Sequence, residues 1–261
     1  MSLRSKLGRI RQSLLCTFNR RTVPLGDCGP IVSFAFDDFP RSAYSVGGAI
    51  LEKYGARGTY YVTAGLTNTS NELGDLFIES DLYSLLEKGH EIASQTFHHS
   101  SCRSLPIAAF QADVNKGVKA LEHLTGGNHI NFAYPYGHVT LESKKALGGY
   151  LTSARSIIPG FNGPEVDLNL LRANSLYGGT ERAGRAKELI AENARRRTWL
   201  IFYTHDVRPN PSEYGCQPEL LEAAVACAAR SGARILSVRE TLAEALAGSK
   251  EAVGVAASHP V

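Results

Sequence analysis

Two adjacent carboxylates, Asp37 and Asp38, end the clearest apolar run of the sequence. Residues 31–36 have the near-continuous apolar character of a parallel strand covered on both faces, and Pro40 prevents its extension. Functional residues in α/β proteins gather at the carboxyl ends of such strands. Because neighbouring carboxylates repel each other, we expect a metal ion or another cation beside them. The alternative is that one Asp caps the next helix while the other is solvated.

Three later strand candidates also end in reactive side chains. His99 follows the strand predicted over 91–94, His138 follows the strand over 130–134, and His205 follows the strand over 199–203. Parallel strands place their carboxyl ends on one face of a barrel, so these side chains are expected to meet. His99 and one Asp could bind a zinc-like ion, leaving the other Asp to accept a proton and His205 to protonate a leaving group.

Strand-like and helix-like segments alternate along most of the chain. This alternation predicts parallel strands joined by right-handed helical crossovers. About seven such units favour an α/β fold of the distorted (β/α)7-barrel type in a single domain. The expected strands are 31–36, 58–62, 91–94, 130–134, 150–157, 199–203 and 233–236, and the expected helices are 42–54, 79–88, 106–125, 141–147, 181–197, 218–229 and 237–247.

The ends of the chain differ from the middle. Residues 1–26 form a basic amphipathic segment with six Lys and Arg and no acid, residues 27–248 form the barrel domain, and residues 249–261 are expected to be disordered. Apolar residues recur at helical spacing from Leu3 to Phe18. Residues 1–22 could lie on an anionic membrane surface, but a terminal helix that packs on the domain or frays is favoured. Basic residues interrupt the apolar core that a signal peptide needs.

Composition narrows the partners and the compartment. A hydrophobic content of 43%, a charged content of 20% and a net charge of +3 describe an ordinary soluble protein and give no support to a nucleic-acid partner. The five cysteines are scattered and form no C-x-x-C pair, which predicts reduced thiols in the cytoplasm. A peripheral membrane contact remains open, and the sequence does not indicate an oligomeric state.

With these residues in view, the chain resembles the polysaccharide deacetylases of carbohydrate esterase family 4, the group that contains the nodulation-type chitooligosaccharide deacetylases. The resemblance extends from residue 32 to about residue 246. Four segments carry it in the family's order: SFAFDD (33–38), GHEIAS (89–94) with the following residues to His99, FAYPYG (132–137) and LIFYTH (200–205).

The resemblance implies a role for each matching residue. Asp37 would be the catalytic base, Asp38 and His99 metal ligands, and His205 the catalytic acid. The backbone N–H of Tyr136 would stabilise the oxyanion together with the metal. The resemblance also implies a divalent metal, zinc in the first place with cobalt or nickel as alternatives, and a substrate-binding wall that includes Tyr134 and Pro135.

Gln95 is the main departure from the family pattern, which has its first metal-binding histidine there. A neutral amide oxygen is a weak zinc ligand, so we expect weak metal binding. Three interpretations stay open: a low-affinity site with Gln95 or water, a rearranged site that recruits His98 or His138, and a site without metal. Both histidines are otherwise expected to be ordinary surface or supporting residues.

Ala133 is a second departure, because the family often has an arginine there that orients the base. Arg172 could replace that arginine through space, although a structural salt bridge is an equally good interpretation. Phe39, where the family commonly has glycine, would narrow the pocket. Tyr134 and Tyr136 are expected as sugar-stacking walls or as buried tyrosines at the barrel mouth.

The leading hypothesis is a metal-dependent hydrolase that removes an N-acetyl or N-formyl group from an amino sugar. Its substrate would be a glycan or glycan precursor, including a lipid-linked sugar. The alternative from another class is a non-catalytic carbohydrate-binding or regulatory relative that has lost the metal because of Gln95. A weaker third hypothesis is a cofactor-free amidase that acts on small cyclic amides.

Overall fold

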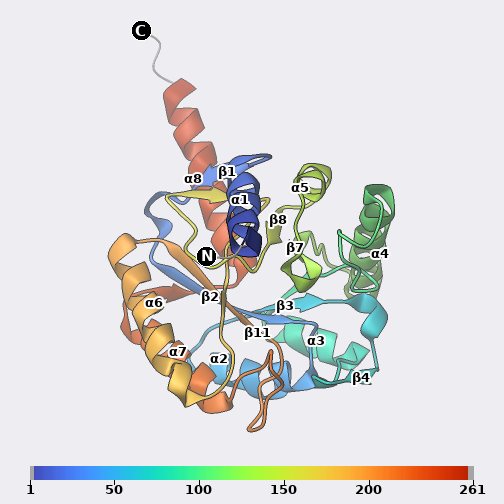
Figure 1. The fold of residues 1–261 in the computed structure, drawn as a ribbon. Helices are drawn as coiled ribbons and strands as arrows, with labels where there is room; N and C mark the ends of the chain where they lie inside the picture. Colours follow the sequence, from blue (N-terminus) through green and yellow to red (C-terminus); the bar gives the residue numbers. More distant parts are fainter. Residues whose placement is uncertain (1–2, 258–261) are drawn as a thin grey trace.

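A curled parallel sheet forms the centre of the computed structural model, which describes residues 3–257 (Figure 1). Its strands follow the order β10-β11-β2-β3-β6-β7-β8, and β12 pairs with the start of β2. All pairings within this sheet are parallel, as the alternating pattern predicts. The strands are β2 (Ile31–Asp37), β3 (Thr59–Val62), β6 (Glu91–Ser94), β7 (Asn131–Ala133), β8 (Ser153–Arg155), β10 (Asn174–Ser175), β11 (Trp199–Thr204) and β12 (Arg234–Ile235).

The two ends of this sheet approach each other through β8 and the segment that leads into β10. Leu171 N donates to Ala154 O at 2.9 Å, and Ser156 N donates to Leu171 O at 2.8 Å. Through these bonds, β8 pairs with the segment that precedes β10, the strand at the opposite edge of the sheet. The sheet therefore curls into the expected distorted barrel, although the strands at the seam are short.

Helices cover the outer face of the sheet (Figure 1). They bury apolar stripes, and Gly126, at φ 69°, ends helix α4 (Ile107–Thr125) in the left-handed conformation that glycine accepts. The helix expected over 42–54 begins with a π-helical segment, Ala43–Gly48. The helices are α2 (Ala49–Lys53), α3 (Glu79–Glu87), α4 (Ile107–Thr125), α5 (Leu141–Leu147), α6 (Ala183–Arg196), α7 (Pro218–Arg230) and α8 (Val238–Ala257).

Several short elements were not expected from the sequence. Two antiparallel pairs, β1 (Thr22–Pro24) with β9 (Glu165–Asp167) and β4 (Ser70–Asn71) with β5 (Gly74–Asp75), are too short to show an apolar period. Four short 3₁₀ turns complete the fold: Gly26–Cys28, Ala64–Leu66, Pro135–Gly137 and Thr180–Arg182.

The C-terminal helix is longer than expected. α8 continues to Ala257, about ten residues beyond its expected end. The rest of the expected tail, residues 258–261, lies outside the described residues. Figure 1 shows α8 projecting away from the barrel.

The N-terminal helix α1 (Leu3–Thr17) is attached to the barrel at its C-terminal end. Leu15 is buried, and the fully buried ammonium of Lys144 donates to Leu15 O at 2.7 Å, Phe18 O at 2.9 Å and Asp167 Oδ2 at 2.9 Å. These bonds confirm the packed-helix interpretation for this end of α1. Since β1 pairs with β9, the boundary expected at residue 26 does not separate a free segment from the barrel. No helix among the described residues is long and apolar enough to cross a membrane.

Candidate active site

The carboxyl ends of the central strands surround a cavity of about 550 Å³. Asp37 at the end of β2, Asp38 after it, His99 after β6 and His205 after β11 all line this cavity. Four of the expected side chains therefore share one cavity, whereas His138, which was expected with them, does not line it. The roles of the four residues remain to be assigned from their contacts.

Asp37 contacts an arginine from the other side of the barrel. Arg155 Nη2 of β8 lies 2.6 Å from both carboxylate oxygens of Asp37. The guanidinium is only 1% exposed, and its central carbon lies 4.7 Å from the Tyr61 ring centroid and 4.9 Å from that of Tyr203. Burial alone would lower the pKa of Arg155, but the Asp37 carboxylate outweighs burial and raises it. Arg155 therefore stays charged and holds Asp37 in place.

Arg155, and not the expected Arg172, is the arginine that contacts Asp37. Arg172 donates to Pro159 O at 3.1 Å and to Cys16 Sγ at 3.2 Å, and it lines a different pocket. The expectation that Arg172 orients the base or contacts substrate is thus wrong, because its segment lies outside the catalytic cavity. Arg155 could have been noticed as the only charge within the strand predicted over 150–157, since a buried arginine needs a partner.

Asp38, His99 and Gln95 form the second cluster of the cavity. His99 Nε2 lies 3.1 Å from Asp38 Oδ1, which is buried and accepts no hydrogen bond of good geometry. The amide Nε2 of Gln95 lies 3.2 Å from the same ring nitrogen, while its Oε1 accepts from Asp38 N at 3.3 Å. One ring nitrogen cannot both donate to Asp38 and accept from Gln95, so the cluster leaves one of these polar contacts unsatisfied.

Charge and burial compete in this cluster. Burial would raise the pKa of the Asp38 carboxyl, but the contact with His99 and the positive charges of His99, His205 and Arg155 outweigh it and lower the pKa. Burial would lower the pKa of His99, and the Asp38 carboxylate outweighs burial and raises it. Each residue therefore favours the charged form of the other.

These residues fit a weakly held divalent ion. Asp38 Oδ1, with no hydrogen bond, and His99 Nε2 face each other as one carboxylate and one imidazole ligand. Gln95 could add an amide oxygen only if its terminal amide turned over. Within residues 3–257, no three His, Cys, Asp or Glu side chains gather as a metal-binding group, so the usual third ligand of a catalytic zinc site is missing.

Neither alternative histidine joins this cluster. His98 Nδ1 lies 2.6 Å from Asp113 Oδ1, and His138 Nδ1 lies 2.8 Å from Ser101 Oγ. Although His98 lines the edge of the cavity, its ring is paired with Asp113 of α4. The structure therefore does not support the rearranged site in which His98 or His138 replaces the missing ligand.

His205 is oriented by the loop that follows it. A carbonyl oxygen only accepts, so the His205 Nδ1–H donates to Tyr214 O at 3.2 Å, and Nε2 faces Asp38 Oδ2 at 3.8 Å. Buried Asp206 organises this loop by accepting from Ser212 N at 2.9 Å. The reactive nitrogen of His205 is therefore directed into the cavity.

Tyr134 and Tyr136 both line the cavity, but they differ in exposure. Tyr134 is 2% exposed and its hydroxyl donates to Asn169 O at 3.4 Å, so its ring offers little surface for stacking. Tyr136 is 59% exposed, and its ring centroid lies 4.5 Å from that of His99. Pro135 is buried and begins the 3₁₀ turn that presents Tyr136.

Backbone strain is concentrated around the cavity. Of the eight non-glycine residues with positive φ among the described residues, five belong to the segments that carry the site: Asp38, Phe39, Thr96, His99 and Tyr136. A left-handed conformation costs a non-glycine residue roughly 1–3 kcal/mol and persists where surrounding contacts enforce it. Phe39 is fully buried against Phe77 and Tyr60, so it supports the turn and does not narrow the cavity as expected.

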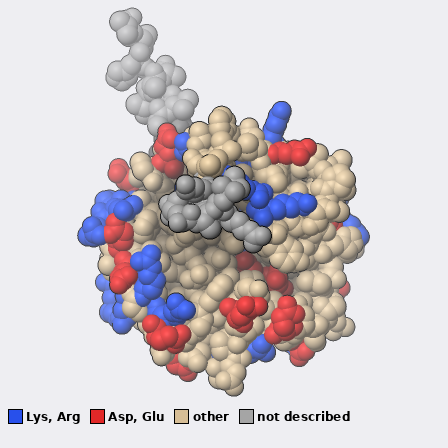
Figure 2. All heavy atoms as spheres, viewed as in Figure 1, with Lys and Arg blue, Asp and Glu red and all other residues tan. Residues whose placement is uncertain are grey.

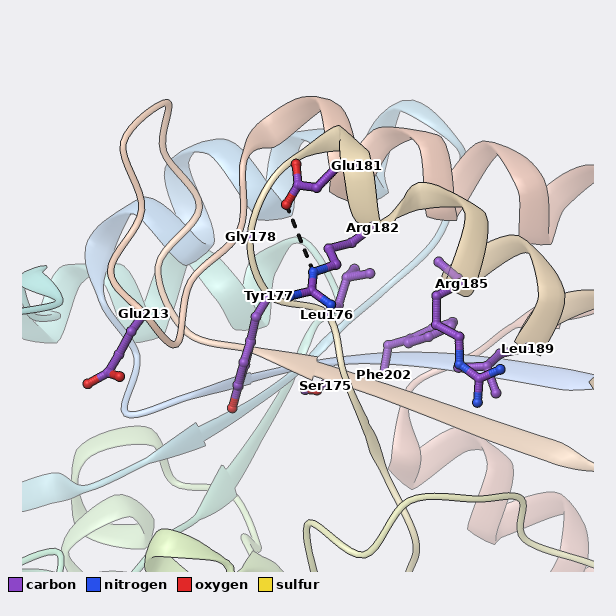
Figure 3. Close-up of a pocket in the computed structure, with 11 residues that line it drawn as sticks. Ser175, Leu176, Tyr177, Gly178, Glu181, Arg182, Arg185, Leu189, Phe202 and Glu213 are labelled. Carbon is purple, nitrogen blue, oxygen red and sulfur yellow. Dashed lines mark ion pairs between the residues drawn. The ribbon is translucent and has the colours of Figure 1, made fainter.

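A second pocket, of about 380 Å³, lies between α6 and the β10–β11 edge of the sheet (Figure 3). Tyr177 lines both pockets. In Figure 3 the Tyr177 side chain points away from Arg185 and Leu189, toward the sheet. The second pocket contains arginine and glutamate side chains but no histidine or aspartate. It therefore lacks the acid–base groups that the larger cavity holds.

Comparisons with known proteins agree with this geometry. The profile of the polysaccharide deacetylase family matches residues 26–149. Bacillus subtilis PdaA, a family 4 carbohydrate esterase, is 14% identical with a TM-score of 0.58, covering 89% of this chain and 88% of its own. The Xyl-CE4 domain of a xylanase from the hindgut metagenome of Trinervitermes trinervoides is 16% identical, with a TM-score of 0.55 and coverages of 83% and 91%.

A third solved structure contains a metal. A family 4 acetyl xylan esterase from Clostridium thermocellum, in complex with a cobalt ion, is 17% identical with a TM-score of 0.51, covering 82% of this chain and 91% of its own. No curated protein matches the chain significantly. At these identities the structural likenesses establish the shared fold.

The curled parallel barrel carries a carboxylate–histidine cavity at its strand ends. In residues 26–149 the chain is similar to the polysaccharide deacetylase family, and it shares the fold of the solved family 4 esterases.

Arg155→Met removes the guanidinium that contacts Asp37 at 2.6 Å and leaves a buried carboxylate without this partner. We expect the free energy of unfolding, measured by urea denaturation, to fall by roughly 3–5 kcal/mol. Arg172→Met is the matched control and should change it by less than about 1 kcal/mol. Equal losses in Arg155→Met and Arg172→Met would contradict the role given to Arg155. If Arg155→Met does not fold, Arg155→Lys is the milder variant.

Proposed function

We propose that this chain is a metal-dependent hydrolase that removes an N-acetyl group from an amino sugar in a glycan or glycan precursor. One observation carries the proposal: a carboxylate held by a buried arginine, a second carboxylate paired with an imidazole, and an oriented histidine share one cavity. Amide hydrolysis requires a base, a cation near the oxyanion and an acid, and these groups match those needs.

Asp37 is the proposed base. Asp37 lines the cavity at the end of β2, where a carboxylate oxygen can accept a proton from an attacking water. Arg155 limits the rotation of this carboxylate from behind, so it acts as a positioning residue and does not itself contact the substrate. Asp38 is committed to His99 and is less available for proton transfer.

His205 is the proposed acid. Its Nδ1–H donates to Tyr214 O, so a protonated ring presents its other N–H, on Nε2, to the cavity. That proton can pass to the departing amine of the sugar. The strained turn at Tyr136, with φ 58°, places the Tyr136 ring 4.5 Å from that of His99, and the backbone N–H of Tyr136 is the proposed donor to the oxyanion.

Asp38 and His99, with Gln95 as a weak third ligand, would hold the divalent ion. When bound, zinc, cobalt or nickel would supply positive charge for the oxyanion. The cobalt ion of the Clostridium thermocellum esterase supports this class of ion.

A non-catalytic carbohydrate-binding protein is the second candidate. It is favoured by Gln95 and by the lack of a three-ligand group among the described residues. The Arg155–Asp37 pair and the oriented His205 favour catalysis, since binding alone needs neither a held base nor an acid.

The catalytic pair can be tested by acetate release from an N-acetylglucosamine oligomer, or formate release from its N-formyl analogue, in the presence of zinc or cobalt. Asp37→Asn and His205→Gln should each lower kcat by at least about 100-fold, because a base or an acid contributes roughly 10²–10⁴-fold. Asp27→Asn and His123→Gln, both on the exposed surface, are matched controls that should keep wild-type rates. A wild-type chain that binds the oligomer but releases no acyl group would favour the binding protein instead.

The weak metal site can be tested by Gln95→His. The new imidazole would lie beside His99 and provide the missing third ligand, so the dissociation constant for zinc should fall at least about tenfold. Isothermal titration calorimetry of chelator-treated protein gives the constant directly. His98→Gln should leave the constant unchanged, because His98 pairs with Asp113. An unchanged constant in Gln95→His would show that the ion, if bound, does not bind here.

A further inference from the structure

The N-terminal helix exposes an apolar stripe. Ile10 is 57% exposed, Leu14 is 43% exposed and Phe18 is 51% exposed. They are four residues apart, and Phe18 N donates to Leu14 O at 2.9 Å, so the helical turn continues to Phe18. Residues with this spacing share one helix face. An aligned set of large exposed apolar side chains of this kind indicates a contact surface.

The barrel fixes the direction of this stripe. Leu15, next to Leu14, packs in the cluster that contains Phe110 and Tyr134, and Lys144 binds the carbonyls at the end of α1. Arg11 Nη2 also donates to Val139 O at 3.1 Å. Because the other side of the helix is attached at these points, the stripe cannot turn inward to bury itself.

The segment that carries the stripe is basic. The chain before Asp27 contains six Lys and Arg and no acid. Arg103 is exposed and adds a further positive charge close to Arg11. The pKa of Arg103 is lowered first by partial burial and then by the charge of Arg11. Figure 2 shows basic side chains beside the N-terminal helix and acidic side chains across the central hollow of that face. Arg20 pairs with Glu165 at 3.8 Å and Arg21 donates to Gly148 O, but the segment as a whole stays basic. A second copy of the chain would place this basic segment against itself, which disfavours a dimer through this face.

The stripe also lies next to the active-site cavity. Val139, which binds Arg11, directly follows the turn that carries Tyr136, and Ile158 packs against the Leu15 cluster. Tyr136 and Ile157 line the cavity and are 59% and 41% exposed. The apolar side chains of α1 and of the cavity rim therefore come from segments in contact.

We propose that Ile10, Leu14 and Phe18 insert into the surface of an anionic lipid bilayer while the basic residues of the N-terminal segment contact its headgroups. Basic amphipathic helices bind membranes in this way, through apolar burial and attraction to anionic lipid. The contact would bring the cavity close to the membrane surface. The bilayer contact does not depend on catalysis and is measured separately from it.

The test is sedimentation of the full chain with vesicles of phosphatidylcholine alone and with vesicles that contain about one-third phosphatidylglycerol. The wild-type chain should pellet with the anionic vesicles, and Ile10→Ser/Leu14→Ser/Phe18→Ser should lower its partition coefficient at least about tenfold. Tyr83→Ser/Tyr150→Ser removes two exposed rings elsewhere and should pellet like wild type. High salt should weaken pelleting of the wild type.

Three results would overturn the proposal: no wild-type pelleting with anionic vesicles, equal pelleting of the triple variant, or an equal loss in the Tyr83/Tyr150 control. A wild-type dimer that the triple variant converts to monomer, seen by size-exclusion chromatography without lipid, would assign the stripe to a second copy and also overturn it. If the triple variant does not show a cooperative melt, Leu14→Ser alone replaces it, with a smaller expected loss of about threefold.

Discussion

The buried contact between Arg155 and Asp37 is the constraint on which the site depends. In the sheet order, β2 and β8 are separated by β3, β6 and β7, so the two side chains can meet only because the sheet curls. A guanidinium that is 1% exposed must be paired, and here Tyr61 and Tyr203 cover its faces while Asp37 satisfies its charge. The same contact therefore links the two sides of the barrel and holds the proposed base in position.

The remaining groups follow from that arrangement. Arg155 holds Asp37, so the neighbouring carboxylate of Asp38 turns toward His99 and the ion-binding cluster. The strained turns at Asp38, His99 and Tyr136 direct their groups to one cavity. Gln95 lies where the missing ligand is expected, yet its amide nitrogen faces His99, so no ligand oxygen of Gln95 is directed at that ring.

The sequence predicts local features well and long-range contacts poorly. The apolar run before Asp37 and the regular alternation of segments were sufficient for the parallel barrel and for the strand ends that form the cavity. The sequence does not indicate that Arg155 contacts Asp37, because this contact crosses the barrel. Arg172, the arginine expected in this role, lies in a segment that faces another pocket. Strands of two or three residues, such as β10, have no readable period, and α8 continues past Gly248, the glycine that favours a helix end there.

A double-mutant cycle on acetate release tests most directly whether Arg155 serves the reaction through Asp37. The four proteins are the wild type, Arg155→Met, Asp37→Asn and the double variant, each compared by kcat/KM at saturating metal. If Arg155 acts only by holding the base, the double variant should be no slower than Asp37→Asn alone. Multiplication of the two single losses would contradict this account, because it would show that the two residues contribute independently.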